Sequence, residues 1–386
     1  MEMRQEKNGK SSKKRICFFS GDITRSGGTE RVSIQLANGM VERNEFKEYE
    51  ICFLSIVEQG AEPFFPIDKR IIRYTLGERW ITPGVGYIPL IMKVNRFLKK
   101  RKTDVIIDID IVLDVLSIPA SVGLKTKVIA WEHFNCEFEQ GIFYRRCISK
   151  MTARFADYIV TLTNEDQKNY EKILGRKRNI KAIYNMILKL EVNENVSREQ
   201  WIVSVGRLTY QKGIDYLIEV ARRVLPQNPE WKWLILGEGE DRIKLENAIK
   251  TYGLENQLIL KGNVRNVDWY LNRARLLVMT SRYEGFGMCL VEALQMHVPC
   301  VSFDVKIGPS EIIADKKNGI LVSPFNCADM AEEIDELLKD PERLQGMAEN
   351  TLIDFERFQD ESILQNWKKV LTKVSTKNVK KSKKSS

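Results

Sequence analysis

The chain has 386 residues, 43% of them hydrophobic, and a formal net charge of +9. This length predicts two domains of ordinary size, each with its own core. No window reaches the roughly 18 to 20 uninterrupted apolar residues of a membrane span, and the N-terminus lacks the hydrophobic core of a secretory signal. We therefore expect a cytoplasmic protein without a membrane-spanning helix.

The positive charge is concentrated at the two ends of the chain. Residues 1–15 hold six Lys or Arg and two Glu, and residues 373–386 hold six Lys and no acid, so the body is close to neutral. A neutral body argues against nucleic acid as a partner. Basic tails of this kind are commonly disordered and solubilising. The alternative is that they bind an anionic membrane surface.

Short apolar runs alternate with helical periods from Arg15 onward, which is typical of βαβ units and parallel sheets. In the first half we expect strands at Ile16–Ser20, Ile51–Ile56, Val105–Asp108, Lys127–Trp131, Tyr158–Leu162 and Ile180–Tyr184, and helices near 29–42, 87–102, 138–155 and 165–174. In the second half we expect strands at Ile202–Val205, Trp233–Leu236, Leu258–Leu260, Leu276–Met279, Cys300–Phe303 and Gly319–Val322, and helices near 213–225, 241–251, 266–273, 288–296, 309–314, 327–338 and 342–352. The fold class is thus α/β, with two doubly wound Rossmann-like domains that face a central cleft.

The domain boundaries follow from changes in composition. We expect a basic leader at 1–14, a first domain at 15–188, a polar linker at 189–199, a second domain at 200–358, a helix at 359–374 and a basic tail at 375–386.

Two segments of the first half, Tyr87–Lys102 and Phe143–Phe155, combine apolar helical spacing with many basic residues. The usual interpretation is a helix that packs its apolar stripe on a sheet and leaves its basic face in solvent. The alternative is a helix face that lies on a membrane.

The motif that carries most chemistry is Arg282-Tyr-Glu284-Gly-Phe-Gly287-Met-Cys-Leu-Val-Glu292. It places one carboxylate, Glu284, in a glycine-flanked loop. The second, Glu292, follows eight residues later, after an apolar run that predicts the first turns of a buried helix. A helix N-terminus attracts anions, typically phosphate. Carboxylates around such a point can accept hydrogen bonds from hydroxyl groups. The pattern therefore suggests that the ligand is a sugar nucleotide.

Two further loops follow strands and open helices. Gly27-Gly28 in the first half would let the backbone approach a pyrophosphate. In the second half, Gly206-Arg207-Leu through Lys212-Gly213 offers two cations for a diphosphate, the Arg in a bidentate manner and the Lys as a point charge. The chain lacks the complete GxGxxG fingerprint, which disfavours a NAD-dependent oxidoreductase.

Together these motifs resemble the family 4 retaining glycosyltransferases of GT-B fold, from about Arg15 to Trp367. The resemblance also rests on Gly308-Pro-Ser-Glu311 and Asn318-Gly-Ile-Leu-Val. The first-half segments Ser26–Arg31 and Trp131–Asn135 resemble the subset that builds bacterial capsule, exopolysaccharide or O-antigen units.

The resemblance implies a role for each matching residue. Arg207 and Lys212 would hold the donor diphosphate, Glu292 the ribose hydroxyls and Glu284 hydroxyls of the transferred sugar, while His133 would contact the sugar near the reacting centre. Of these, Glu284, His133, Arg207 and Lys212 form the catalytic set. The remaining donor-binding residues would be Gly27, Gly28, Phe286, Gly287 and Met288, with Val264 beside the base.

The resemblance also implies a mechanism without a metal ion or other cofactor. Asp108-Ile-Asp110 has the form of a metal-binding DxD motif, but it ends a first-domain strand, so we assign it no metal. The anomeric configuration would be retained by front-side attack, with a donor phosphate oxygen helping to deprotonate the acceptor. Double displacement with Glu284 as nucleophile is the alternative.

The resemblance thus implies a glycosyltransferase that moves a hexose or N-acetylhexosamine from a UDP-sugar to a lipid-linked saccharide acceptor at the inner face of the plasma membrane. The first domain would be the acceptor side, the second would bind the nucleotide sugar, and the helix at 359–374 would cross back to the first domain. The alternatives are a nucleotide-sugar epimerase or phosphorylase of the same fold, and a non-catalytic partner of a glycosyltransferase.

Overall fold

The structure is a computed structural model that describes residues 13–77, 86–136, 143–175, 179–187, 189–193 and 195–382. Several predicted segments lie partly outside the described residues, among them the basic leader, the helix near 138–155, the linker and the basic tail.

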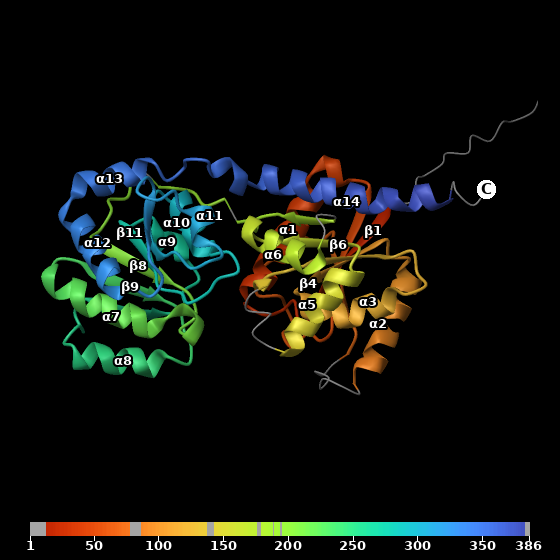
Figure 1. Cartoon of the computed structure of the whole chain (residues 1–386), viewed down its shortest axis with the longest axis horizontal. Helices are drawn as coiled ribbons and strands as arrows, with labels where there is room; N and C mark the ends of the chain where they lie inside the picture. Colours follow the sequence, from red (N-terminus) through yellow and green to blue (C-terminus); the bar gives the residue numbers. More distant parts are fainter. Residues whose placement is uncertain are drawn as a thin grey trace, which may run out of the picture.

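Two parallel sheets organise the described chain (Figure 1). The first has the order β3-β2-β1-β4-β5-β6-β7, with β1 (Lys14–Ser20), β2 (Tyr49–Ser55), β3 (Ile72–Thr75), β4 (Val105–Ile109), β5 (Lys127–Trp131), β6 (Tyr158–Thr161) and β7 (Ile180–Ala182). The second has the order β10-β9-β8-β11-β12-β13, with β8 (Trp201–Val205), β9 (Lys232–Leu236), β10 (Leu258–Gly262), β11 (Leu276–Met279), β12 (Cys300–Phe303) and β13 (Gly319–Val322). The predicted α/β class with two doubly wound Rossmann-like domains is confirmed, because each sheet is parallel and its strands alternate with helices.

Helices connect successive strands of each sheet. In the first half these are α1 (Gly28–Glu42), α2 (Tyr87–Arg101), α3 (Asp114–Ser121), α5 (Phe143–Phe155) and α6 (Asn164–Leu174). In the second half they are α7 (Ile214–Val224), α8 (Arg242–Thr251), α9 (Val267–Leu271), α10 (Met288–Gln295), α11 (Pro309–Ile312) and α12 (Cys327–Lys339), followed by α13 (Pro341–Glu349) and α14 (Asp360–Ser382).

The strands form where the sequence has continuous apolar runs, as expected for strands covered on both faces. All five residues of β4 are buried. Two elements were not predicted. The edge strand β3 is partly exposed and contains Arg73 and Thr75 instead of an apolar run, and α3 contains Pro119, which normally argues against a helix.

The final helix, α14, lies along the first domain (Figure 1). It packs against α1, and its Trp367 is fully buried with its ring centroid 5.0 Å from that of Trp131 on β5. The helix continues beyond Val374 to Ser382, into the predicted basic tail. The last described helix therefore returns to the first domain.

The two basic amphipathic helices face the core differently. On α2, Leu90, Val94 and Leu98 are buried, so much of the predicted stripe packs inward. On α5 the predicted inward packing of the aromatic stripe is wrong: Phe143 is 72% and Phe155 63% exposed. The buried face of α5 consists of Ser149, Thr152 and Ala153, because small side chains allow close packing and the Thr152 hydroxyl donates to Asp114. None of the helices in the described part of the chain is long and apolar enough to cross a membrane.

Candidate active site

The loops at the carboxyl ends of β1 and β5 meet the loop between β11 and α10. A Cβ atom on Gly285 would lie 2.3 Å from the His133 carbonyl oxygen, so only glycine fits this contact between the two domains. The Met288 side chain lies beside Gly28, where an added Cβ would be 3.3 Å from the methionine Cε. The structure therefore brings the predicted first-domain and second-domain loops together.

Glu284 is paired with a cation of its own domain. Its Oε1 accepts a hydrogen bond of 2.5 Å from the Lys212 ammonium, and its side chain is nearly inaccessible. The pKa of Lys212 is raised: burial alone would lower it, but the charge of Glu284 and the hydrogen bond outweigh that effect. The backbone carbonyl of Glu284 accepts a 2.8 Å hydrogen bond from the Asn135 amide of the first domain.

Glu292 is paired with a cation of the opposite domain. Its carboxylate, on α10, accepts a hydrogen bond from Nη2 of Arg31, on the first turn of α1. Glu292 is only 7% exposed. Arg31 belongs to the segment Ser26–Arg31, which carries part of the resemblance, but nothing in the sequence predicts that it pairs with a residue of the second domain.

The remaining predicted donor-binding residues of the second domain lie on loops that follow strands. Arg207 is exposed after β8, and its positive charge opposes protonation of Lys212, so the two cations are near each other. Gly287 adopts φ 98°, a left-handed conformation, as N-cap of α10, and no side chain of the described residues caps that helix. Phe286 is buried and stacks on Tyr184, with ring centroids 5.4 Å apart. Val264 lies on the loop after β10, partly buried.

His133 follows β5 and is 8% exposed. Burial lowers the pKa of its imidazole to about 3, so the ring is neutral near pH 7. The ring centroid lies 4.3 Å from that of Trp131, and among the described residues Nε2 has no hydrogen-bond partner. A neutral imidazole can exchange hydrogen bonds with a sugar hydroxyl, but it cannot contribute a positive charge.

The two carboxylates of the DxD-like motif have separate structural partners. Asp108 is fully buried and accepts a hydrogen bond from Ser117, and burial raises its pKa to about 6. Asp110 caps the following turn by accepting from the backbone N–H of Val112 at 3.2 Å. Among the described residues there is no group of three or more His, Cys, Asp or Glu side chains that could hold a metal ion.

A third polar contact between the domains involves Glu311, on α11. Its carboxylate accepts hydrogen bonds of 2.9 Å from the backbone N–H groups of Asn164 and Glu165, at the N-terminus of α6. It also accepts from the Tyr184 hydroxyl at 3.1 Å. An anion at a helix N-terminus is favoured by the helix dipole. In the sequence Glu311 is recognisable only as part of the Gly308–Glu311 motif. Nothing in the sequence predicts that it contacts the first domain.

Comparison with known proteins identifies this arrangement. The family described as glycosyl transferases group 1 matches residues 168–352, a segment that includes Arg207, Lys212, Glu284 and Glu292. The second half of the chain is therefore similar to group 1 glycosyltransferases. The resemblance inferred from the motifs is thereby confirmed for the second half of the chain.

Similar proteins extend this glycosyltransferase relationship over most of the chain. A Haemophilus influenzae protein named as an uncharacterized glycosyltransferase is 29% identical over 93% of this chain and 100% of its own length. A Campylobacter jejuni alpha-1,4-N-acetyl-D-galactosaminyltransferase, named for a saccharide on PP-undecaprenol, is 24% identical over 93% of this chain and 99% of its own.

Solved structures show the same fold. TarM superimposes with a TM-score of 0.78 at 17% identity, covering 92% of this chain and 98% of its own. HepE from Anabaena, in complex with UDP-glucose, superimposes with a TM-score of 0.76 at 21% identity, covering 93% of this chain and 99% of its own.

Replacement of the buried histidine should change how stability depends on pH. An unfolded chain takes up a proton on histidine below about pH 6.5, whereas folded His133 remains neutral down to a pKa of about 3. The unfolded state therefore binds more protons in this window, and the free energy of unfolding falls as the pH falls. We expect His133→Gln to lose less stability than the wild type between about pH 7.5 and pH 5 in urea unfolding. Equal slopes for the wild type and His133→Gln would contradict a buried neutral ring.

Proposed function

We propose that the protein is a retaining, metal-independent glycosyltransferase that moves a hexose or N-acetylhexosamine from a UDP-sugar to a lipid-linked saccharide in cell-surface polysaccharide synthesis. The observation that carries this proposal is the meeting of Lys212, Glu284 and Glu292 at the junction of the two domains, with Arg207 nearby. Cations there match a diphosphate, and carboxylates match the hydroxyls of ribose and sugar.

The ion pairs are consistent with a site that rearranges when the donor binds. A diphosphate attracts the ammonium of Lys212 away from Glu284, whose carboxylate then accepts hydrogen bonds from the transferred sugar. The uncapped N-terminus of α10 adds N–H donors for negatively charged oxygen. Arg207, at the edge of the same site, forms a second cationic contact to the diphosphate.

In the proposed reaction an acceptor hydroxyl oxygen forms a bond to the anomeric carbon while the bond from that carbon to the diphosphate oxygen breaks. The electron pair of that bond leaves with UDP, and the hydroxyl proton passes to a phosphate oxygen of the departing group. Arg207 and Lys212 stabilise the growing negative charge on the diphosphate. Removal of one such contact typically costs about a hundredfold to a thousandfold in kcat.

Relatives support the substrate classes of this proposal. HepE was crystallised with UDP-glucose, and the Campylobacter jejuni relative is named for an acceptor on PP-undecaprenol. An Erwinia amylovora relative is named as an amylovoran biosynthesis glycosyltransferase. Metal independence is proposed because the cations that face the site are themselves available for the charge of the leaving group.

The direct test is a donor screen. Purified protein is incubated with UDP-glucose, UDP-galactose and their N-acetylated forms, together with a saccharide on undecaprenyl diphosphate. We expect one donor to give a product whose new bond keeps the α configuration in NMR spectra, at a rate that EDTA does not lower. A β-linked product would contradict retention, loss of activity in EDTA would contradict metal independence, and conversion of UDP-sugar to its epimer without acceptor would favour an epimerase.

The two acids are expected to have separate roles. Glu292→Gln should weaken UDP binding by about tenfold, since charged hydrogen bonds to the ribose are lost. Glu284→Gln should leave UDP binding unchanged or tighter, because Lys212 is released, while kcat falls by about tenfold or more through loss of sugar positioning. Calorimetry with UDP and steady-state kinetics separate the two effects. Glu219→Gln, which removes a surface carboxylate on α7, is the control, and equal effects of Glu284 and Glu292 substitutions on UDP would contradict the division of roles.

We also propose that the first domain lies on an anionic membrane. The helices α2, α3 and α5 are neighbours, with α3 in contact with both of the others. Their outer surface exposes Ile88, Met92, Phe143 and Phe155, which is an unusual density of large apolar side chains. Lipid is the occupant that the charges favour, because basic side chains interleave with these apolar residues on both α2 and α5.

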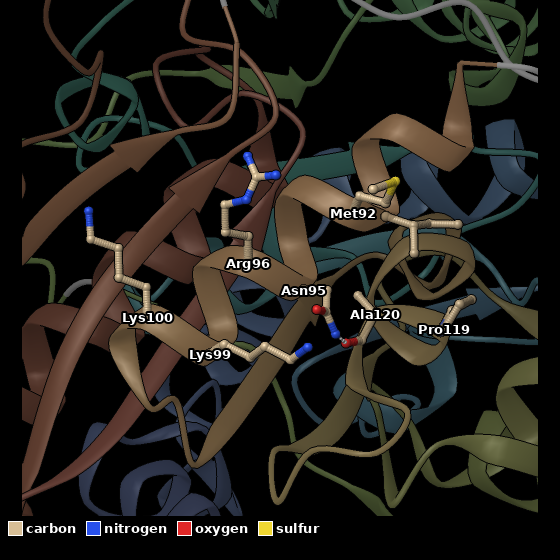
Figure 2. A pocket seen from close by; sticks show the side chains of 8 residues that line it. Met92, Asn95, Arg96, Lys99, Lys100, Pro119 and Ala120 are labelled. Atoms are coloured by element: carbon tan, nitrogen blue, oxygen red, sulfur yellow. Dashed lines mark hydrogen bonds between the residues drawn. The ribbon is translucent and has the colours of Figure 1, made fainter.

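A cavity of about 620 Å³ between α2 and α3 lies within this surface (Figure 2). Its lining combines Met92, Pro119 and Ala120 with the cations Arg96, Lys99 and Lys100, none of which pairs with a carboxylate in the described part of the chain. Unpaired cations beside apolar side chains suit an anionic lipid headgroup.

Neutralising this cationic group should weaken membrane binding. At about 1 kcal/mol for each basic residue near the surface, replacing Arg96, Lys99 and Lys100 by Gln should reduce affinity for phosphatidylglycerol vesicles by about a hundredfold. Vesicle sedimentation measures this, and activity on a soluble acceptor should be unchanged. Replacement of Lys232, Lys244 and Lys250 on the second domain is the matched control. Unchanged binding by the triple variant, with loss on deletion of residues 375–386, would assign membrane attachment to the tail instead.

A further inference from the structure

Among the described residues of the first domain, only Arg31 has a charged side chain that contacts a predicted donor-binding carboxylate. It lies on the first turn of α1, directly after the Gly27-Gly28 turn. Its Nη2 donates to Glu292 and also lies 4.0 Å from Sδ of Met288. Both of these contacts cross from one domain to the other.

The Arg31 guanidinium has unused hydrogen-bonding capacity. A guanidinium carries five N–H donors in a planar fork. Its Nε is buried and has no partner among the described residues. A buried, unpaired donor of a charged group is costly, so the position is better suited to a state in which an additional acceptor is present.

The identity of that acceptor follows from the surrounding groups. Glu292 already neutralises the charge of Arg31 in this structure, so a second carboxylate nearby would add repulsion unless further cations were present. The second domain supplies such cations, because Lys212 and Arg207 lie near each other there and Lys212 pairs with Glu284. An anion with several oxygens, placed between the first turn of α1 and these two cations, would satisfy all three side chains.

We propose that Arg31 is a donor-binding residue which holds the diphosphate of the nucleotide sugar from the first domain. This inference rests on the proposed nucleotide-sugar function. In this structure the guanidinium pairs with Glu292. When the donor enters, the N–H groups of Arg31 turn to phosphate oxygens, and the Glu292 carboxylate accepts the ribose hydroxyls in their place.

The exchange leaves no charge without a partner. Before donor binding, Arg31 and Lys212 neutralise Glu292 and Glu284. After donor binding, both cations face phosphate and both carboxylates accept hydroxyl protons in hydrogen bonds. Because Arg31 and Lys212 belong to different domains, the diphosphate connects the two domains through them.

The test compares a ligand that has phosphates with one that has none. Binding of UDP is measured by calorimetry and binding of uridine by ligand-observed NMR, for the wild type, Arg31→Gln and Arg31→Lys. Arg31→Gln should weaken UDP by about tenfold to a hundredfold, the range of one charged hydrogen bond. It should leave uridine binding unchanged or tighter, because Glu292 is released. Arg31→Lys keeps the charge and should restore part of the UDP affinity.

A matched control lies at the other end of the same helix. Arg43, just after α1, pairs with Glu361 of α14 far from the donor-binding loops, and Arg43→Gln should bind both ligands like the wild type. Unchanged UDP binding in Arg31→Gln would overturn the proposal. Tighter binding of both ligands would also overturn it, because Arg31 would then only hold Glu292 away from the ligand. An equal loss of affinity for both ligands would overturn it as well, because the role of Arg31 would then be structural.

Failure of the proposed function has a different signature. If the wild type binds ADP or GDP in place of UDP, the proposed uridine donor is wrong, and the same comparison with that nucleotide and its nucleoside tests Arg31. If the wild type binds no nucleoside diphosphate, both the proposed function and the role of Arg31 are overturned.

Discussion

A carboxylate removed from water needs a cation or hydrogen-bond donors close to it, and the junction of the two domains buries two carboxylates. Glu284 and Glu292 are only 5% and 7% exposed, and each is paired with one cation. Buried pairs of this kind contribute little net stability, since desolvation offsets attraction. Their value here is that either partner can be exchanged for a ligand group of the same charge or hydrogen-bonding type.

The two pairs differ in what they connect. The Lys212–Glu284 pair lies within the second domain, whereas the Arg31–Glu292 pair crosses between domains. The crossing contacts through Asn135 and Glu311 are also polar, while Phe286 stacks on Tyr184 in one aromatic contact between the domains. Polar interfaces separate more easily than apolar ones. The buried packing of Trp367 against Trp131 is apolar, so α14 is the more durable attachment to the first domain.

The sequence was sufficient to predict what depends on local pattern. Strands of a parallel sheet are continuous apolar runs, so most of them could be located, while the partly exposed β3 and the Pro119-containing α3 lacked such a pattern. The loops of the candidate site were found because glycines and charges follow strands. The partner of Arg31 could not be found, because it depends on how two domains pack across 261 residues of chain. The outward stripe of α5 was missed for a related reason: periodicity defines a face of a helix but not its direction.

The loops that contain His133 and Gly285 approach each other closely, and this approach determines whether the contacts between the two domains can form here. Gly285 lies against the His133 carbonyl, and a Cβ there, at 2.3 Å from the oxygen, would force the loop away by about an ångström. Such a shift would move Glu284, the preceding residue, relative to His133. Both residues are proposed to contact the same sugar, and a displacement of this size is enough to disturb a reacting geometry. Gly285 therefore affects the proposed chemistry only by allowing the two loops to approach closely, without contacting the substrate.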